Sequence, residues 1–505
     1  MNMASLLKSF TSLICILLTC LQTIGSTEHE NPPRIAIIGA GIGGTSAAYF
    51  LREHFGPDVK IDVFEKRSVG GRAATILFND EQYEAGASII HPRNMYMVNF
   101  TKLFGLEPLG GAESGKLGIF DGKDMVFSTS DWGVVTMAKM VWRYGWDVFS
   151  IRSYINDHLF TEFLKIYDIQ SLGYSFTTVA DLLLAMNETF VELTKKSIDD
   201  VLKDAGFSER FINEFVMGAL RMNYGQKLGL PAFVGSVSLA AAGESGLWSV
   251  KGGNKLVPQK LLESSKATLI EATVTKVTFQ DDVGPMYEVE YAKNSDGKDA
   301  GPNRREYDVV IIATPLHDKV TDIKFEEFPK PIHNFPQPFH TTVATFVEAK
   351  PNISYFGYSE VCHFPDVVFT CDKDLYFNSI GKHHPVEGTS ETESENKNSI
   401  YKIFSNAVPT VQQIDNLFAD KNDLRIVEWL AYPQYNIGDE LPPFVLHDQL
   451  YYINGIELAA SALEMSAIGA KNIANLIVNH WTGNMDKIDE FSWRDESLKT
   501  DKTEL

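Results

Sequence analysis

Positive charge is scarce in this 505-residue chain, which carries 45 Lys and Arg against 66 Asp and Glu, for a formal net charge of −21. Nucleic-acid binding needs a basic face, and attachment to an anionic membrane by charge alone needs a basic cluster, so the balance argues against both. Hydrophobic residues make up 44% and charged residues 22%, as is typical of a globular enzyme. A chain of this length is expected to form two or three domains.

Metal-binding and hydrolase motifs are also lacking. The 12 histidines and four cysteines show no HExxH or CxxC spacing, so we predict no metal site. No G-x-S-x-G nucleophile motif occurs. Residues 110–116 fit the pattern GxxxxGK, but Leu117 stands where a P-loop needs Ser or Thr, so we interpret this segment as an ordinary loop.

A long apolar run occurs only at the N-terminus. The run from Phe10 to Ile24 follows Lys8 and ends in small residues, which is typical of a signal peptide and predicts one over residues 1–25. The run is short for a membrane span of roughly 20 residues, although an uncleaved anchor remains the alternative. We therefore expect the mature protein to be soluble, in a lumen or outside the cell.

Three other features of the sequence become relevant if the chain enters the secretory pathway. The mature chain keeps Cys362 and Cys371, which either form a disulfide or remain two buried thiols. Sequons at Asn99, Asn187 and Asn352 are predicted glycosylation sites. The C-terminal "KTEL" is close to a K-D-E-L retention signal but lacks its Asp, and a solvated tail is the alternative.

The hydrophobic pattern alternates between two kinds of segment. A strand at Arg34–Ile38, a helix at Gly43–His54 and a strand at Lys60–Phe64 form a predicted βαβ unit. Strands return before Leu316, with a hairpin loop over 293–305, and a strand followed by an Ala-rich helix appears near the C-terminus. Between these blocks the chain is rich in aromatic and helical patterns, such as "TEFLKIYDIQ" and "SERFINEFVMGALRM".

We therefore predict the α/β class, with a Rossmann-like dinucleotide-binding domain assembled from discontinuous segments and a mixed α+β substrate domain. The predicted division assigns 33–98, 245–325 and 445–480 to the first domain, 99–244 and 326–444 to the second, 385–399 to a disordered loop and 481–505 to a C-terminal tail.

The stretch "GAGIGG" follows the first predicted strand and begins the helix, as in a Rossmann fingerprint. In that arrangement Gly39 makes the tight turn, Gly41 admits the pyrophosphate, and Gly44 allows close packing of helix on strand, with Gly43 in the same loop. The fingerprint also needs an acid at the end of the second strand. Glu65 stands there, 21 residues after Gly44, where it can accept hydrogen bonds from an adenosine ribose.

The residues after Glu65 distinguish FAD from NAD. "EKRSVGGRAAT" matches the E-x(4)-G-G-R pattern of the amine-oxidase-like FAD flavoproteins and predicts FAD as the cofactor. Gly71 and its neighbour form a second glycine turn that lets the backbone approach the flavin end, and Arg72 is expected to supply positive charge near the diphosphate or the isoalloxazine. No second GxGxxG provides a pyridine-nucleotide site, so electrons are expected to pass to oxygen.

Further segments resemble the same flavoproteins. "YEAGASIIHP" resembles the segment that runs along the flavin through Ala87 and Ser88, and "KGGNKLVPQKLLE" precedes the strand whose Val274 would meet the adenine. "YDVVIIATPL" resembles the strand that ends near Thr314. The resemblance places Met465 in a helix whose N-terminus points at the flavin and stabilises its anionic reduced form. That helix begins "ALEMS" instead of with glycines, which argues against a generic amine oxidase.

Over nearly its whole mature length the chain resembles the prenylcysteine oxidases. The matching text includes "YEAGASIIHPRN", "KMVWRYGW", "RMNYGQ", "GLWSVKGGNKLV" and "WLAYPQY", of which "RMNYGQ" and "WLAYPQY" are not shared with amine oxidases generally. The resemblance implies a lysosomal FAD thioether oxidase, with secretion as the alternative location. Such an enzyme converts S-farnesyl- or S-geranylgeranyl-cysteine, O2 and water into prenyl aldehyde, cysteine and hydrogen peroxide.

This chemistry needs little acid–base catalysis, because loss of hydride from a carbon that is both allylic and next to sulfur leaves a stabilised cation. The protein must mainly hold the substrate, shield the cofactor and bind an apolar tail. Within family-like segments we predict His91, Tyr224 and Tyr432 as polar contacts near the flavin or the cysteine end. Glu464 is a candidate to bind the substrate ammonium, with helix capping as its alternative.

An aromatic segment offers candidates for binding the prenyl tail. They either line an apolar channel or make a peripheral membrane contact, with ordinary core packing as the alternative: Met140, Trp142, Tyr144, Trp146 and Phe149. Two other functions stay open at this point. An amine (polyamine) oxidase would need an acidic, aromatic-walled cleft, and a secreted flavoprotein with mainly a binding role would need no turnover.

Overall fold

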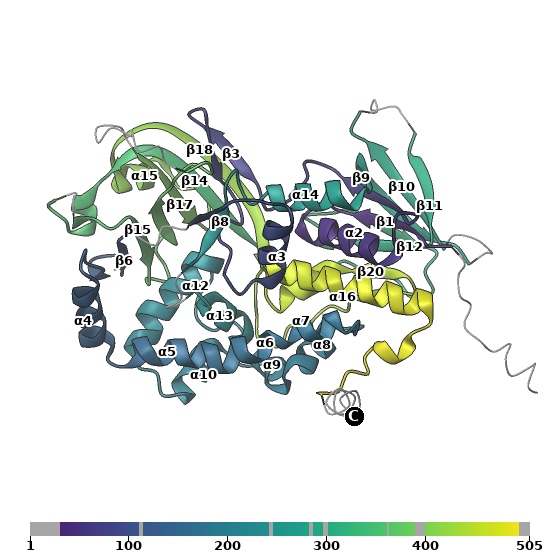
Figure 1. Cartoon of the computed structure of the whole chain (residues 1–505). Coiled ribbons are helices and arrows are strands. Elements are labelled where there is room, and N and C mark those ends of the chain that lie inside the picture. The colour runs from purple at the N-terminus through teal and green to yellow at the C-terminus, as the bar shows by residue number, and fades with distance from the viewer. Residues whose placement is uncertain are drawn as a thin grey trace, which may run out of the picture.

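In the computed structural model, most of the chain forms two sheets joined by a layer of helices (Figure 1). The described residues are 31–110, 115–241, 246–281, 286–295, 301–360, 363–388 and 399–493. Several predictions fall outside them, namely the signal peptide, Cys362, most of the 385–399 loop and the C-terminal "KTEL".

The first sheet has nine strands, in the order β11-β10-β9-β2-β1-β12-β20-β19, with β13 paired to β9. Its centre is parallel, and β1 (Arg34–Ile38) lies between β2 (Lys60–Glu65) and β12 (Val309–Ile312). This order is that of a doubly wound nucleotide-binding sheet. The remaining strands are β9 (Thr268–Phe279), β10 (Tyr287–Lys293), β11 (Asn303–Tyr307), β13 (Lys324–Glu326), β19 (Val445–His447) and β20 (Leu450–Tyr452). A hairpin is present, because β10 pairs antiparallel with β11, but β11 begins inside the predicted loop and the predicted second strand forms β12, which pairs in parallel with β1.

Three helices lie together beside this sheet on the right of Figure 1: α2 (Ile42–Phe55), α14 (Leu256–Ser265) and α16 (Leu463–Thr482). Alternation along β1 supplies two cores, because Ile35 and Ile37 join the core of these helices while Ala36 and Ile38 join a second core with β9, β10 and β11. The predicted βαβ unit is confirmed, with its helix one residue longer at each end and its second strand extended to Glu65.

The second sheet has seven strands, in the order β18-β14-β17-β16-β15-β6-β7. All neighbours are antiparallel except β15 and β6, which are parallel. Its members are β6 (Leu117–Phe120), β7 (Met125–Ser128), β14 (Phe339–Pro351), β15 (Val367–Thr370), β16 (Ser379–Lys382), β17 (Ser399–Ser405) and β18 (Phe418–Pro433). Two small sheets pair β3 (Thr75–Phe78) with β4 (Glu81–Glu84) and β5 (Pro108–Gly110) with β8 (Trp248–Val250).

A layer of helices lies below the second sheet in Figure 1. It consists of α4 (Gly133–Tyr144), α5 (Asp147–Ile155), α6 (Thr161–Phe163), α7 (Lys165–Ser171), α8 (Val179–Met186), α9 (Glu188–Leu193), α10 (Ile198–Asp204), α11 (Glu209–Phe211), α12 (Met217–Tyr224) and α13 (Ala232–Leu239). Both predicted helical segments lie here, but π-helical turns at Asn156–Phe160 and Ile212–Val216 adjoin or interrupt them. No helix within the described residues is both long and apolar enough to cross a bilayer.

Candidate dinucleotide-binding and active site

The loop between β1 and α2 is packed so closely that two of its glycines admit no side chain. Gly39 has φ +114°, and a Cβ there would lie 2.5 Å from the carbonyl oxygen of Ala313. A Cβ on Gly44 would lie 2.0 Å from the carbonyl oxygen of Gly39, and one on Gly43 would lie 3.0 Å from Ile453. The tight turn and the close helix packing that the fingerprint predicts for Gly39 and Gly44 are therefore present.

Gly41 differs from its neighbours, because a Cβ there would meet no atom within 4 Å. It precedes the first residue of α2, whose N-terminus has no side-chain cap. The first amides of a helix have no partner inside the helix, and together with the helix dipole they favour an anion. Open space beside uncapped amides fits the pyrophosphate of a dinucleotide, as predicted from the sequence.

Glu65 ties this loop to the end of β2. One carboxylate oxygen accepts a hydrogen bond from the Ala40 amide at 2.9 Å, and the other accepts one from the Arg67 amide at 2.8 Å. The acid therefore lies at the edge of the glycine loop, where the fingerprint requires it. Its hydrogen bond to a ribose stays a prediction.

The second glycine turn lies directly against the first. Gly70 and Gly71 both have positive φ, and the Gly70 amide donates to the Ala40 carbonyl at 2.9 Å. A Cβ on Gly71 would lie 3.4 Å from the Cα of Gly41. One extended ligand can therefore follow both turns, which agrees with the E-x(4)-G-G-R pattern.

Arg72 has a different electrostatic role from the one the sequence suggests. Its guanidinium pairs with both carboxylate oxygens of Glu457, one of them at 2.9 Å, and also donates to the Ala431 carbonyl at 2.5 Å. Glu457 is buried and accepts a further hydrogen bond from Asn454. The positive charge expected for a phosphate or flavin is thus balanced inside the protein. Arg72 acts by holding the second glycine turn against β18 and the segment before α16.

The segment with Ala87 and Ser88 runs beside the second glycine turn. The Ala87 amide donates to the Arg72 carbonyl at 3.1 Å, and the Asn254 side chain donates to the Ala87 carbonyl at 2.9 Å. A Cβ on Gly86 would lie 1.9 Å from the Arg72 carbonyl oxygen, so this glycine is required as well. No role for Gly86 or Asn254 was predicted from the sequence, although a glycine between two alanines was a usable signal.

Three further predicted cofactor contacts lie in or directly after neighbouring elements. Thr314 follows β12, and its amide nitrogen lies 3.5 Å from the position of a Cβ on Gly39. Met465 is buried in the first turn of α16, where the next residue, Ser466, adjoins Gly43. Val274 is buried in β9, beyond the part of that strand that pairs with β2. The structure thus brings the start of α16 to the glycine loop, and the individual cofactor contacts stay predictions.

Tyr224 and Tyr432 come together next to Arg72. Their rings meet edge to face with centroids 5.0 Å apart, and Tyr435 packs on Tyr224 at 5.5 Å. The Tyr224 hydroxyl donates to the Ser461 carbonyl at 3.0 Å, and the Tyr432 hydroxyl donates to the Asn223 carbonyl at 3.0 Å. Burial raises the pKa of Tyr432 to about 12 and that of Tyr224 further, so both are neutral hydrogen-bond donors.

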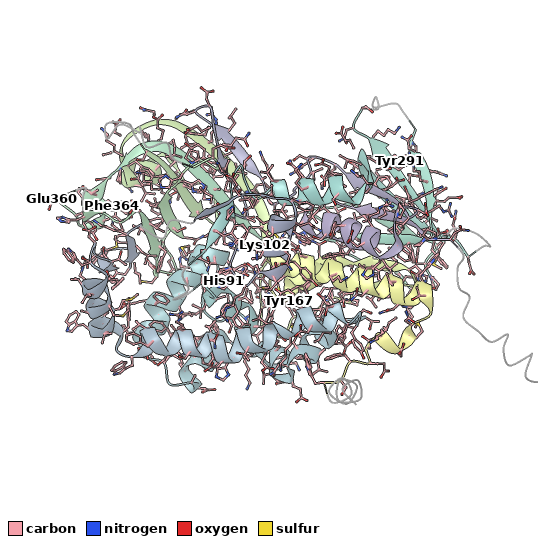
Figure 2. All side chains as sticks on the ribbon, in the orientation of Figure 1. His91, Lys102, Tyr167, Tyr291, Glu360 and Phe364 are labelled. Carbon is pink, nitrogen blue, oxygen red and sulfur yellow. The ribbon has the colours of Figure 1, made fainter. Side chains whose placement is uncertain are left out.

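Glu464 is buried, and groups of the protein hydrogen-bond to its carboxylate, so its contacts favour the capping alternative and the ammonium role stays a prediction. Its carboxylate accepts hydrogen bonds from the amides of Tyr96 at 2.7 Å and Met97 at 3.0 Å, in the first turn of α3 (Met95–Leu103). The Tyr167 hydroxyl, beside the beginning of α16 in Figure 2, donates at 2.8 Å. Glu464 therefore caps α3 rather than its own helix. Burial raises its pKa to about 7.

His91 lies in the loop before α3, in the centre of the molecule (Figure 2). Its ring stacks on Phe160 with centroids 5.0 Å apart, and its Nδ1 accepts the Arg93 amide at 3.1 Å. These contacts fix the loop that leads into α3, and α3 is the helix that Glu464 caps. A role for His91 at a substrate stays a prediction.

The predicted modification sites differ in their surroundings. Asn99 is exposed on α3. The side chain of Asn187 caps α9 and donates to Glu162, and that of Asn352 donates to the Asn416 carbonyl. Cys371 is half-buried, and its candidate partner lies outside the described residues. Glycosylation and the disulfide stay predictions.

The aromatic segment does not line an interior channel. Tyr144 is buried and packs on Phe127 and Phe211, which makes it a core residue. Trp142, Trp146 and Phe149 are exposed on the outside of the protein. The channel role predicted for them is therefore wrong, and the surface role remains.

Cavities elsewhere do not compete with the glycine loop as the cofactor site. A cavity of about 520 Å³ lies at the opposite end of the first sheet, lined by the beginnings of β1, β2 and β9 with Arg34, Lys60 and Thr268. Open α/β sheets bind nucleotides at the carboxyl ends of their strands, where the glycine loop lies. Among the described residues, no three or more His, Cys, Asp or Glu are arranged to hold a metal ion.

Solved structures share this architecture. Putrescine oxidase bound to putrescine matches with a TM-score of 0.55 at 13% identity, over 88% of this chain and 99% of that one. A fatty acid isomerase from P. acnes matches with a TM-score of 0.59 at 14% identity, over 89% of this chain and 99% of that one. Residues 37–102 match the model of an NAD(P)-binding Rossmann-like domain. The protein has the α/β fold of these enzymes with a Rossmann-like dinucleotide-binding domain, which confirms the predicted fold class.

The rest of the chain identifies the family. Residues 127–490 match the prenylcysteine lyase model. The chain is 42% identical to prenylcysteine oxidase 1 of Homo sapiens over 99% of both chains. It is 38% identical to prenylcysteine oxidase 1-like of Bos taurus over 94% of this chain and 96% of that one. The chain belongs to the prenylcysteine lyase family, as the resemblance of its segments predicts.

Proposed function

We propose that this protein is an FAD-dependent thioether oxidase that acts on S-farnesyl- and S-geranylgeranyl-cysteine in the degradation of prenylated proteins. One prenylcysteine, one O2 and one water give one prenyl aldehyde, one cysteine and one hydrogen peroxide. The 42% identity to prenylcysteine oxidase 1 of Homo sapiens, over 99% of both chains, supports this reaction. The observation that most directly supports FAD as the cofactor is the open space at Gly41, with the second glycine turn directly against it.

The chain fits FAD through residues from several elements. The groups that would hold it are Gly39, Gly41, Gly43 and Gly44 in the first glycine turn, Glu65 at the end of β2, Gly71 in the second glycine turn, Ala87 and Ser88 in the segment beside it, and Val274, Thr314 and Met465 in neighbouring elements. Arg72 would act through its pair with Glu457, which holds the second glycine turn in place. When bound, FAD supplies the acceptor for a hydride from the prenyl carbon next to sulfur and passes the electrons to O2. The N-terminus of α16, which adjoins Gly43, contributes a positive helix end there.

The tyrosines shape the site and need not exchange protons. Their hydroxyls are already donated to the carbonyls of Ser461 and Asn223, and burial keeps the pKa of Tyr432 near 12. They hold the ends of α12 and β18 against the segment before α16. Sulfur and the adjacent double bond stabilise the cation that water attacks, so a strong general base is not required.

We further propose delivery through the secretory pathway to the lysosome, with secretion as the alternative, and contact with a lipid surface. The signal-peptide-like N-terminus and the sequons at Asn99, Asn187 and Asn352 support entry into that pathway.

The function is tested by measuring hydrogen peroxide from the purified holoprotein with farnesylcysteine, with spermine and with S-dodecylcysteine. We expect peroxide from farnesylcysteine only, because S-dodecylcysteine has a similar apolar tail but lacks the allylic carbon. Peroxide from spermine alone would contradict the proposal and favour an amine oxidase.

A further inference from the structure

Helix α4 turns its apolar side away from the protein. In α-helical spacing, Val134, Met137, Ala138, Val141 and Trp142 form one continuous side. Val134 is 84% exposed and Trp142 is 86% exposed. A surface helix of a globular protein normally buries its apolar side in the core, so the outward orientation of this side in α4 needs another explanation.

The other side of α4 anchors the helix through polar and aromatic contacts. Arg143 pairs with Glu214 through two hydrogen bonds of 2.6 and 2.8 Å, and Thr136 bonds to Ser130. Tyr144 is buried against Phe127 and Phe211. These contacts hold α4 in its orientation, so the outward apolar side is built into the fold.

The exposed apolar residues extend past α4 to the start of α5 and form what we call the aromatic patch. Its members are Trp132, Val134, Val135, Met137, Trp142, Trp146 and Phe149, all of them exposed. Three of the seven tryptophans of the chain belong to it, and the rings of Trp146 and Phe149 lie 5.5 Å apart. The patch lies around α4, at the left edge of Figure 1 and far from the first sheet.

The charge around the patch suits an anionic lipid surface. The chain carries a net charge of −21, yet residues 132–146 contain no Asp or Glu, and the bordering Asp131 and Asp147 are engaged by Lys116 and Ser208. Arg143 is paired with Glu214, which leaves Lys139 as the exposed cation on α4. Arg152 adds an exposed cation on α5. A short amphipathic helix with Trp on one side and cations at its flank is the arrangement that lies in a membrane interface, with tryptophan at the headgroup level.

We propose that the aromatic patch docks this protein on a phospholipid membrane, with α4 lying in the interface. The choice of a lipid surface as the partner rests on the proposed function, because a prenylated substrate partitions into that phase. Docking there places the helical layer at the surface from which the substrate comes. Salt screens the acidic remainder of the chain beyond about 10 Å, so the apolar area and the cations at the patch carry the contact.

The test is flotation of the purified full-length mature holoprotein with vesicles of phosphatidylcholine and phosphatidylserine. The patch variant carries Trp132→Ser, Trp142→Ser and Trp146→Ser. The control variant carries Leu77→Ser and Val411→Ser, which are 62% and 72% exposed on other surfaces. We expect the patch variant to lose vesicle binding by roughly tenfold or more, because each tryptophan contributes apolar area at the interface, while the control floats with the wild type.

A wild type that stays unbound, or a patch variant that floats as well as the wild type, would overturn the proposal. So would a wild-type dimer that does not float and that the patch substitutions dissociate, since the patch would then join two copies of the chain. Turnover separates this proposal from the proposed function. The patch variant should oxidise farnesylcysteine in detergent at the wild-type rate and lose activity only on vesicle-embedded substrate. Absence of turnover in the wild type would contradict the proposed function. The flotation result alone would then decide whether the patch docks on a membrane.

Discussion

The guanidinium of Arg72 and the carboxylate of Glu457 form a bidentate ion pair across 385 positions of the sequence. The pair joins the second glycine turn, which follows β2, to the segment that leads into α16. Asn454 and the Ala431 carbonyl complete its hydrogen bonds. Three separated segments are thereby fixed around the place where the dinucleotide is expected.

Replacing Arg72 by Ala should destabilise this junction. Glu457, which is 1% exposed, would be left as a buried charge without its partner. We expect a loss of about 2–4 kcal/mol in the free energy of unfolding, less than for a fully buried pair because Arg72 is partly exposed, together with loss of bound flavin. Urea unfolding and the flavin absorbance of the purified variant measure both effects. Arg304→Ala, at an exposed ion pair on β11, should change neither by much, and an equal effect there would contradict the assignment.

Two glycines of the first loop should respond differently to Ala. In Gly44→Ala the new Cβ meets the Gly39 carbonyl at 2.0 Å, so the fold itself should lose about 1–3 kcal/mol of stability or more. In Gly41→Ala the Cβ meets nothing, so the apoprotein should unfold as the wild type does. Its FAD affinity should fall by roughly tenfold or more, because the methyl group occupies the space assigned to the pyrophosphate. A Gly41→Ala variant with undiminished FAD affinity would contradict the site.

Glu464 should contribute stability at acid pH that is lost as the pH rises to neutral. Burial raises its pKa from the ordinary 4.5 to about 7 in the folded chain. The protonated carboxyl therefore favours folding, so this contribution is complete below pH 4.5 and is lost as the pH rises to about 7. It amounts to at most about 3 kcal/mol.

Unfolding in urea at pH 4.5, 6 and 8 tests this pH dependence. Glu464→Gln should weaken it by the Glu464 share while costing about 1 kcal/mol throughout, because an amide cannot accept from both the Tyr96 and Met97 amides as a carboxylate does. Glu84, whose pKa burial also raises to about 7, keeps its own share in this variant. Glu209→Gln, at an exposed position, should keep the wild-type profile. An unchanged profile in Glu464→Gln would show that another group carries the dependence.

Tyr224→Phe should separate positioning from catalysis. The change removes the hydrogen bond to the Ser461 carbonyl and should cost about 1 kcal/mol of stability. Because the hydroxyl is committed to that carbonyl, kcat should fall by less than about tenfold, with the effect on KM of similar size. A loss of kcat of about a hundredfold or more at unchanged stability would instead make Tyr224 a catalytic residue.

The sequence predicts the nucleotide-binding half of the fold well because the signals there are local. A short buried strand, a glycine turn and an Ala-rich helix follow one another within residues 34–55, and turn chemistry alone requires small residues at Gly39 and Gly44. The acid at the end of β2 is set by the length of the βαβ unit. Family-like segments then predicted the membership of the chain without any contact information.

Side-chain partners were not predictable in the same way, because tertiary packing chooses them. Nothing near Arg72 in the sequence indicates that Glu457 neutralises it. The position of Glu464 at the start of α16 suggests a free helix end, yet it caps α3 from 368 positions away. Periodicity shows that α4 has an apolar side, but whether that side faces the core or the solvent depends on Glu214 and Phe211.

The central claim is tested most directly by the flavin itself. Farnesylcysteine is mixed with the purified holoprotein in the absence of oxygen, and the absorbance of the oxidised flavin is recorded before and after air is admitted. We predict bleaching by farnesylcysteine and recovery with release of peroxide when oxygen returns. A flavin that stays oxidised with every prenyl thioether, or that bleaches only with spermine, would contradict the account.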